Sequence, residues 1–427
     1  MNAILLLLAL QGRVLGLDEA LKTAAARQPQ LRQAHANTDV ARARANEARA
    51  PLMPQVLGTA SYQRSTANFV LRPGANPPSS LSAPIPTPNS NTFDFFNFGI
   101  TASQTVWDFG GNYYRWKSGQ ATTDATAATE KATTLQVGAS VRVAYFGARA
   151  QKALIVVAKE TLDNQERHLQ QIEGFVKVGT RPEIDLAQAR TDKANAVVML
   201  INAENGYETA KALLNQTMGV ETPTDYDVSD ESLPPLDVED LPVEAQVNEA
   251  VKTRPEIVSF DQQVRAQQLA LKGTVGAYGP SIGVSTGLTD AGSDITNLGW
   301  NWNASVTVTW QLFQGLLTWS QVKEAKATIV SLEAQRDVLR QQVRFDVDQA
   351  RLQVRAGKAA LVATDEALVN ARERLRLAEG RYQAGVGNII ELGDAQVALT
   401  NASAQRVQAE YTLATARAQL MRALGRP

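Results

Sequence analysis

Cysteine is absent from the 427-residue sequence, and histidine occurs only twice, as His35 and His168. Without cysteine the chain has no disulfide framework, no thiolate metal site and no acceptor for an N-terminal lipid anchor. Because metal binding and general-base catalysis depend heavily on histidine, the composition argues against an enzyme, a metal site or a cofactor. His168 follows Arg167 in a helical stretch, and we expect it to be solvated.

A charge imbalance is also missing, since 42 lysine and arginine residues stand against 43 aspartate and glutamate residues. Nucleic-acid-binding proteins usually carry a clustered basic face, so we expect no nucleic-acid partner. The N-terminal apolar run 4–10 is too short to span a bilayer, which takes about 20 residues. It fits the core of a signal peptide with Val14-Leu15-Gly16 as the cleavage site. We predict a signal peptide over residues 1–16, against the alternative of a frayed first helix.

What the sequence does contain is a tandem repeat, the first pattern to seek in a long chain. Segment 27–31 (RQPQL) recurs as 253–257 (TRPEI), and 54–56 (PQV) recurs as 280–282 (PSI). The first copy carries an insert rich in proline, serine and asparagine, which indicates a loop. The predicted segments are the loop at 72–91, a first repeat over 17–219, an acidic linker at 220–241 and a second repeat over 242–427.

Two stretches, 97–106 and 300–310, alternate between apolar and polar residues, which is the pattern of a strand with two different faces. Neither face carries a charge, the apolar face ends in aromatic residues, and the other face is small and polar. Strands of about ten residues can span a bilayer when tilted, with aromatic girdles at the interfaces. Because a closed barrel takes about eight strands, a chain with four must oligomerise. The predicted girdle residues are Phe98, Trp107, Trp300, Trp302 and Trp310.

Two runs without proline, from about 111 to 178 and from about 315 to 384, predict helices of roughly 100 Å at 1.5 Å per residue. A heptad seam from Val347 to Tyr382 predicts a coiled-coil partner, and a shorter seam around Gln165 matches it. Each run ends at a glycine and then returns, which predicts two hairpins. The acids at the start of the return helices can be explained by the helix dipole at least as well as by a functional role.

The ordered set of motifs resembles the TolC family of outer-membrane efflux proteins. Segment 50–56 (APLMPQV), followed by an alternating strand, is similar to the family's first passage from helix to strand. Segments 175–189 and 380–396 resemble its two helix-turn-helix regions. The resemblance covers nearly the whole chain, in order and in duplicate.

This resemblance implies a mainly α fold with transmembrane β structure. Three chains would form a homotrimer in which an α-helical barrel continues into a β-barrel built from four strands per chain. The implied function is an outer-membrane exit duct of a tripartite efflux or type I secretion system, gated at its periplasmic helical end. The implied partners are a periplasmic adaptor protein, an inner-membrane transporter of RND, ABC or MFS type, and outer-membrane lipid. A periplasmic coiled-coil scaffold or adaptor without a pore is the alternative.

The resemblance also implies a gate. Glu391 and Asp394 match the family's acidic constriction, while Asp185 and Tyr382 match its gating network. A basic residue common in the family is replaced by Gly387, and we expect Arg181 to supply the charge instead. The residues that match the adaptor-docking tips are Val178, Gly179, Thr180, Gly385, Val386, Gly387 and Asn388.

Overall fold

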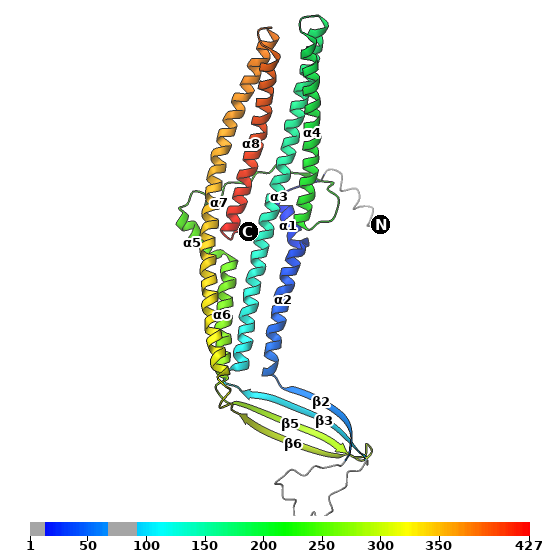
Figure 1. Ribbon diagram of the computed structural model, residues 1–427, viewed down its shortest axis with the longest axis vertical. Coiled ribbons are helices and arrows are strands. Elements are labelled where there is room, and N and C mark those ends of the chain that lie inside the picture. Colours follow the sequence, from blue (N-terminus) through cyan, green and yellow to red (C-terminus); the bar gives the residue numbers. More distant parts are fainter. Residues whose placement is uncertain (1–12, 67–91) are drawn as a thin grey trace, which may run out of the picture. The chain divides into compact units, whose positions relative to one another are not determined.

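The computed structural model describes residues 13–66 and 92–427. Most of the predicted signal peptide and the predicted loop at 72–91 therefore lie outside the described residues. The fold is mainly α, as predicted (Figure 1). None of the described helices combines the length and the apolar character that a membrane-spanning helix requires.

The elements come in a similar order in the two halves of the chain. The first half contains β1 (Val14–Leu15), α1 (Leu17–Arg27), α2 (Pro29–Arg49), the short 3-10 helix η1 (Ala50–Leu52), β2 (Gln55–Thr66), β3 (Thr92–Trp107), α3 (Gly111–Lys177) and α4 (Glu183–Met218). The second half contains β4 (Asp227–Val228), α5 (Val243–Thr253), α6 (Pro255–Gly276), β5 (Ser281–Gly292), β6 (Gly299–Thr309), α7 (Leu317–Gln383) and α8 (Ile389–Ala423).

The chain forms two compact units, and each draws on both predicted repeats. The strand unit contains 40–123 and 262–332, and the helical unit contains 124–261, 333–427 and the described residues before 40. The long helices α3 and α7 contribute residues to both units.

In the strand unit, four antiparallel strands form one sheet in the order β2-β3-β5-β6. The register places Ile100, Leu288 and Trp302 side by side on one face, and Ser103, Ser285 and Ser305 on the other. The apolar and polar faces of neighbouring strands therefore coincide. A β-bulge between Thr105 and Trp107 lets Trp107 pair with Ile282 on the apolar face.

The predicted girdle residues are all exposed, from 39% at Phe98 to 76% at Trp300. Trp310 lies just beyond the end of β6, where its indole N–H donates to the carbonyl of Tyr278 at 3.1 Å. The register also places Asp290 between Phe98 and Trp300 on the apolar face. Alternation in segments 97–106 and 300–310 could not reveal this acid, because it lies on β5.

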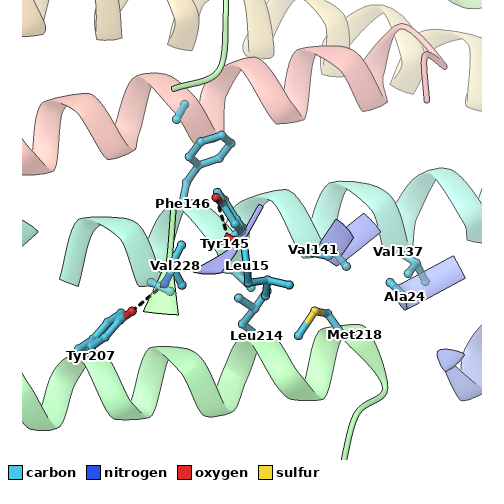
Figure 2. Packing of buried hydrophobic residues seen from close by; sticks show 14 residues of the cluster. Leu15, Ala24, Val137, Val141, Tyr145, Phe146, Tyr207, Leu214, Met218 and Val228 are labelled. Carbon is cyan, nitrogen blue, oxygen red and sulfur yellow. Dashed lines mark hydrogen bonds between the residues drawn. The ribbon is translucent and has the colours of Figure 1, made fainter. Parts of the chain in front are cut away.

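In the helical unit, the main hydrophobic cluster packs α3 and α4 against the short strands β1 and β4 (Figure 2). Tyr145 is fully buried, and its hydroxyl lies 2.7 Å from the hydroxyl of Ser229. Tyr207 donates to the Asp227 carboxylate at 2.6 Å. Leu15 is 6% exposed within this cluster, so the folded unit uses residues that the predicted signal peptide includes.

The helical unit also contains two antiparallel hairpins, α3 with α4 and α7 with α8 (Figure 1). The predicted seam on α7 is buried or half-buried along its length, from Val347 at 0% to Tyr382 at 2% exposure. Gln165, which interrupts the seam on α3, is also buried and donates from its amide to Gln396 on α8 at 3.0 Å. A polar pair therefore occupies the position where the apolar pattern breaks.

Gly219 and Gly179 provide a matched test of how helix ends are stabilised. Both adopt a left-handed backbone, with φ of 69° and 76°. A Cβ at Gly219 would lie 2.7 Å from the Cα of Gln28, whereas a Cβ at Gly179 would meet nothing within 4 Å. We expect Gly179→Ala to cost about 1–2 kcal/mol for the backbone, and Gly219→Ala to cost about 1–3 kcal/mol more for the collision. Denaturant unfolding in detergent measures both, and equal losses would contradict the expectation.

Candidate functional site

The two hairpin turns have nearly the same backbone geometry. Gly179 and Gly385 both have φ of 76°, and each closes its helix by donating to the third carbonyl back along the chain, at 3.0 and 3.1 Å. Each turn then exposes one valine, Val178 at 71% and Val386 at 70%. Asn388 caps α8 by accepting from the Glu391 N–H at 2.7 Å. The predicted tip residues therefore lie at two turns that each present a small apolar surface.

Arg181 connects one hairpin turn to the other. Its guanidinium carbon lies 4.5 Å from the centroid of the Tyr382 ring. Its Nη2 donates to the carbonyl oxygens of Tyr382 at 3.5 Å and Gly387 at 3.4 Å. Arg181 therefore contacts an aromatic ring and two carbonyl oxygens, and among the described residues it has no carboxylate partner. Arg181 thus brings a positive charge to the position where the sequence has Gly387.

Gly387 could not itself carry a basic side chain in this conformation. A Cβ there would lie 2.9 Å from the backbone nitrogen of Tyr382 and 3.0 Å from the carbonyl carbon of Arg381. The N–H of Gly387 also donates to the carbonyl of Arg381 at 2.9 Å. The tight turn therefore favours glycine at position 387. That Arg181 replaces the family's basic residue stays a prediction.

Tyr382 lies at the centre of the contact between the hairpins. It is 2% exposed, and its hydroxyl has no hydrogen-bond partner among the described residues. Its ring centroid lies 5.5 Å from that of His168 and 6.4 Å from that of Phe175. Burial raises the pKa of Tyr382, Asp185 raises it further and Arg181 opposes the rise. Tyr382 is therefore neutral at physiological pH.

The expectation that His168 is solvated is wrong, because the side chain is only 7% exposed. It lies three residues after Gln165 and four before Ile172, and both of these residues are buried. That spacing places it on the buried side of α3 against Tyr382. The spacing was the sequence signal that could have identified it.

The predicted acids do not gather at one point. Asp185 is 7% exposed and Asp394 is exposed, and both line a groove of about 700 Å³ between α4 and α8. Glu391 instead pairs with Arg381 on its own hairpin at 3.4 Å, with both side chains about half exposed. Such a pair contributes about 0–1 kcal/mol. Among the described residues, no group of acids and histidines is close enough to hold a metal ion.

Burial lowers the pKa of His168, while Asp192, Asp185 and a hydrogen bond with Gln171 oppose the shift. A histidine whose pKa is lower in the folded protein binds protons more readily when unfolded. Stability around His168 is therefore full above the unfolded value of 6.5 and is lost as the pH falls below it, by at most about 1.4 kcal/mol per pH unit. This loss of stability ends once the pH is below the pKa of His168 in the folded protein.

We therefore expect the hairpin ends to exchange amide hydrogens faster at pH 5.5 than at pH 7.5, after correction for intrinsic rates. Peptides from 165–176 would report the change. In His168→Gln the change should be much smaller, because the group that titrates is missing. An equal pH response in the variant would show that His168 does not cause the effect.

Both the sequence and the fold of this chain are similar to those of known proteins. The sequence model of a family described as outer membrane efflux protein matches residues 20–220 and 247–426. Outer membrane protein TolC of Escherichia coli is 24% identical over 93% of this chain and 79% of its own length. The toluene efflux pump outer membrane protein TtgC of Pseudomonas putida is 26% identical over 96% and 82%. The outer membrane protein VceC of Vibrio cholerae shares the fold with a TM-score of 0.80, at 18% identity over 96% of both chains.

Proposed function

Because the chain belongs to the outer membrane efflux protein family, we propose that it is the exit duct of a tripartite efflux or type I secretion system. It is an outer-membrane channel protein that extends into the periplasm, and it is not an enzyme. Its partners in this proposal are a periplasmic adaptor and an inner-membrane transporter of RND, ABC or MFS type. The exposed Val178 and Val386 at the two turns are the surface offered to the adaptor.

The sheet of the strand unit carries the proposal. Its outermost strands, β2 and β6, each have one edge that no other described strand pairs with. Its apolar face exposes Ile100 and Trp302 at 61% and 62%. Unpaired edges and a broad apolar face are unfavourable in water. A homotrimer supplies a partner for every edge, with four strands from each of three chains, twelve in all. Lipid then covers the apolar face, an arrangement that a periplasmic scaffold would not need.

The gate in this proposal is the contact between the hairpin ends. Arg181 and Tyr382 contact each other across the two hairpins of one chain. Asp185 and Asp394 line the groove beside them, and Glu391 lies in the first turn of α8. Three copies of these acids around one axis would attract cations and slow anions. An adaptor that binds the turns could then separate the hairpins and widen the opening.

The test is single-channel conductance in a planar bilayer, with wild type beside Asp185→Ala/Glu391→Ala/Asp394→Ala. We expect small, cation-preferring currents from the wild type, and larger currents with a weaker cation preference from the variant. A matched control removes three exposed acids elsewhere on the same hairpins, Glu204→Ala/Glu366→Ala/Glu379→Ala, and should conduct like the wild type.

Two results would contradict the proposal at different levels. A soluble protein without channel activity would favour the coiled-coil scaffold. A large current that the three substitutions leave unchanged would keep the pore and remove these acids from the gate.

A further inference from the structure

Four basic side chains lie against aromatic rings in the strand unit. Lys117 Nζ is 4.7 Å from the ring centroid of Trp116, and the Arg49 guanidinium carbon is 5.5 Å from the same centroid. Lys117 also lies 5.9 Å from Tyr113. The other two stacks are Lys272 on Tyr114 at 5.8 Å and Lys323 on Trp319 at 5.3 Å. We call these residues the basic–aromatic collar: Arg49, Tyr113, Tyr114, Trp116, Lys117, Lys272, Trp319 and Lys323.

The helical part of the strand unit is strongly basic, although the whole chain has a net charge of -1. Its helical segments are 40–49, 111–123, 262–276 and 317–332. The basic residues there are Arg42, Arg44, Arg49, Arg115, Lys117, Arg265, Lys272, Lys323 and Lys326, and the acids are Glu47 and Glu324. Within the described part of the chain, none of the four collar cations has a carboxylate partner, and Lys117 donates to the Gln120 amide oxygen at 3.1 Å. The charges of these four side chains are therefore available to an external anion.

The collar cations on α3, α6 and α7 lie on the sides of their helices that face away from a shared groove. Arg115, Gln267 and Gln321 line a groove of about 450 Å³ on α3, α6 and α7. At about 100° per residue, Lys117 lies about 160° around α3 from Arg115, and Lys323 lies about 160° around α7 from Gln321. By the same count, Lys272 lies about 140° around α6 from Gln267. All three therefore point away from the groove.

The collar continues from the apolar face of the sheet. Trp107 lies on that face opposite Ile282, and its ring centroid is 5.8 Å from that of Phe109 in the following turn. Helix α3 begins at Gly111, so Trp116 lies roughly 8 Å along the helix. The headgroup layer on each side of a bilayer is about 5–8 Å thick. If the sheet lies in the bilayer, side chains this far along α3 from its start would lie at the level of the headgroups.

We propose that the basic–aromatic collar binds the phosphate groups of anionic phospholipids in the leaflet that borders the helices. This inference rests on the proposed function, because it requires the sheet to be in the membrane. The rings hold Arg49 and Lys117 by cation–π contact, which restricts their side chains before a lipid arrives. Amphipathic rings suit this interface, and each cation near an anionic membrane surface strengthens binding.

The test uses the full-length protein, purified in detergent, freed of lipid and titrated with phosphatidylglycerol or phosphatidylcholine while bound lipid is counted by native mass spectrometry. We expect wild type to prefer phosphatidylglycerol. Each lost cation should weaken that binding about fivefold, so Arg49→Gln/Lys117→Gln should weaken it about 25-fold and leave phosphatidylcholine unchanged. Arg115→Gln, which removes a charge from the groove side of the same helix, should change binding less than twofold.

Several outcomes would overturn the inference. One is equal phosphatidylglycerol binding by the wild type and the double variant, and another is displacement of the lipid by inorganic phosphate at the same concentration. If the double variant does not fold, Lys272→Gln/Lys323→Gln makes the same test at the other two cations. A wild type that conducts in bilayers without a lipid preference rejects the collar alone, whereas a wild type that forms no channel rejects the proposed function.

Discussion

Replacing Arg181 with alanine is expected to raise the single-channel conductance severalfold in the absence of an adaptor. Arg181 joins one hairpin end to the other, because it contacts the ring and carbonyl of Tyr382 and the carbonyl of Gly387. A partly desolvated cation–π contact contributes about 2 kcal/mol. Loss of that amount in each chain would shift the balance between closed and open hairpins about thirtyfold. Planar-bilayer recording measures the conductance and the fraction of time spent open.

Two further variants make this result specific. Arg381→Ala removes a cation from the same region, but its pair with Glu391 is exposed, so conductance should stay close to wild type. Arg181→Lys keeps the charge and loses the planar group that stacks on Tyr382, and an intermediate conductance is expected. If Arg181→Ala conducts like the wild type, closure depends on contacts elsewhere, with neighbouring chains foremost among them.

Much of the fold could be predicted because local patterns determine it. The seam from Val347 to Tyr382 repeats every seven residues, and its burial on α7 is confirmed. The turns at Gly179 and Gly385 were predictable since a left-handed residue ends each helix. The resemblance to the TolC family is likewise confirmed. The pairing of strands was not predictable, because the bulge before Trp107 depends on a partner strand far away in the sequence.

The candidate site was harder to predict because it depends on packing between hairpins. Nothing local to Arg181 indicates that it stacks on Tyr382, about 200 residues later in the chain. Glu391 and Asp394 were matched to the acidic constriction and Asp185 to the gating network, and this assignment stays a prediction. Within one chain, Glu391 pairs with Arg381, while Asp185 and Asp394 line the same groove. His168 was assigned to solvent because its charged neighbour Arg167 was given more weight than its position relative to Ile172. Side chains on two helices meet only after the hairpins have packed.

The largest loss of stability is expected from Glu239→Ala, in the predicted linker. The Glu239 side chain is 1% exposed and accepts from Arg417 Nε at 2.7 Å and Lys358 Nζ at 2.6 Å. It also accepts from the Leu236 N–H at 2.9 Å. Removing one partner of a buried ion pair costs about 3–5 kcal/mol, and here Arg417, which is 11% exposed, would lose its carboxylate. Lys358 is 37% exposed and keeps Asp240 at 3.5 Å, so it adds little to this loss.

Local opening of the linker would report this loss directly. Hydrogen exchange in 236–250 should accelerate by at least about 150-fold in Glu239→Ala, the equivalent of about 3 kcal/mol. Glu244→Ala breaks an exposed pair with Arg344 in the same region and should change exchange only slightly. Similar exchange in the two variants would mean that the packing of Val238 and Leu236 holds the linker without the ionic cluster.

The same cluster predicts how the linker responds to acid. Burial alone would raise the pKa of Glu239, but hydrogen bonds from Lys358, Leu236 and Arg417 outweigh it and hold the pKa below its ordinary value of 4.5. A carboxylate with a lowered folded pKa contributes its full stability above the unfolded value and loses it as the pH falls through the folded one. The linker of the wild type should therefore stay protected down to about pH 4.5 and open below it. In Glu239→Gln, protection should be low at neutral pH and nearly independent of acid, since the titrating group is gone.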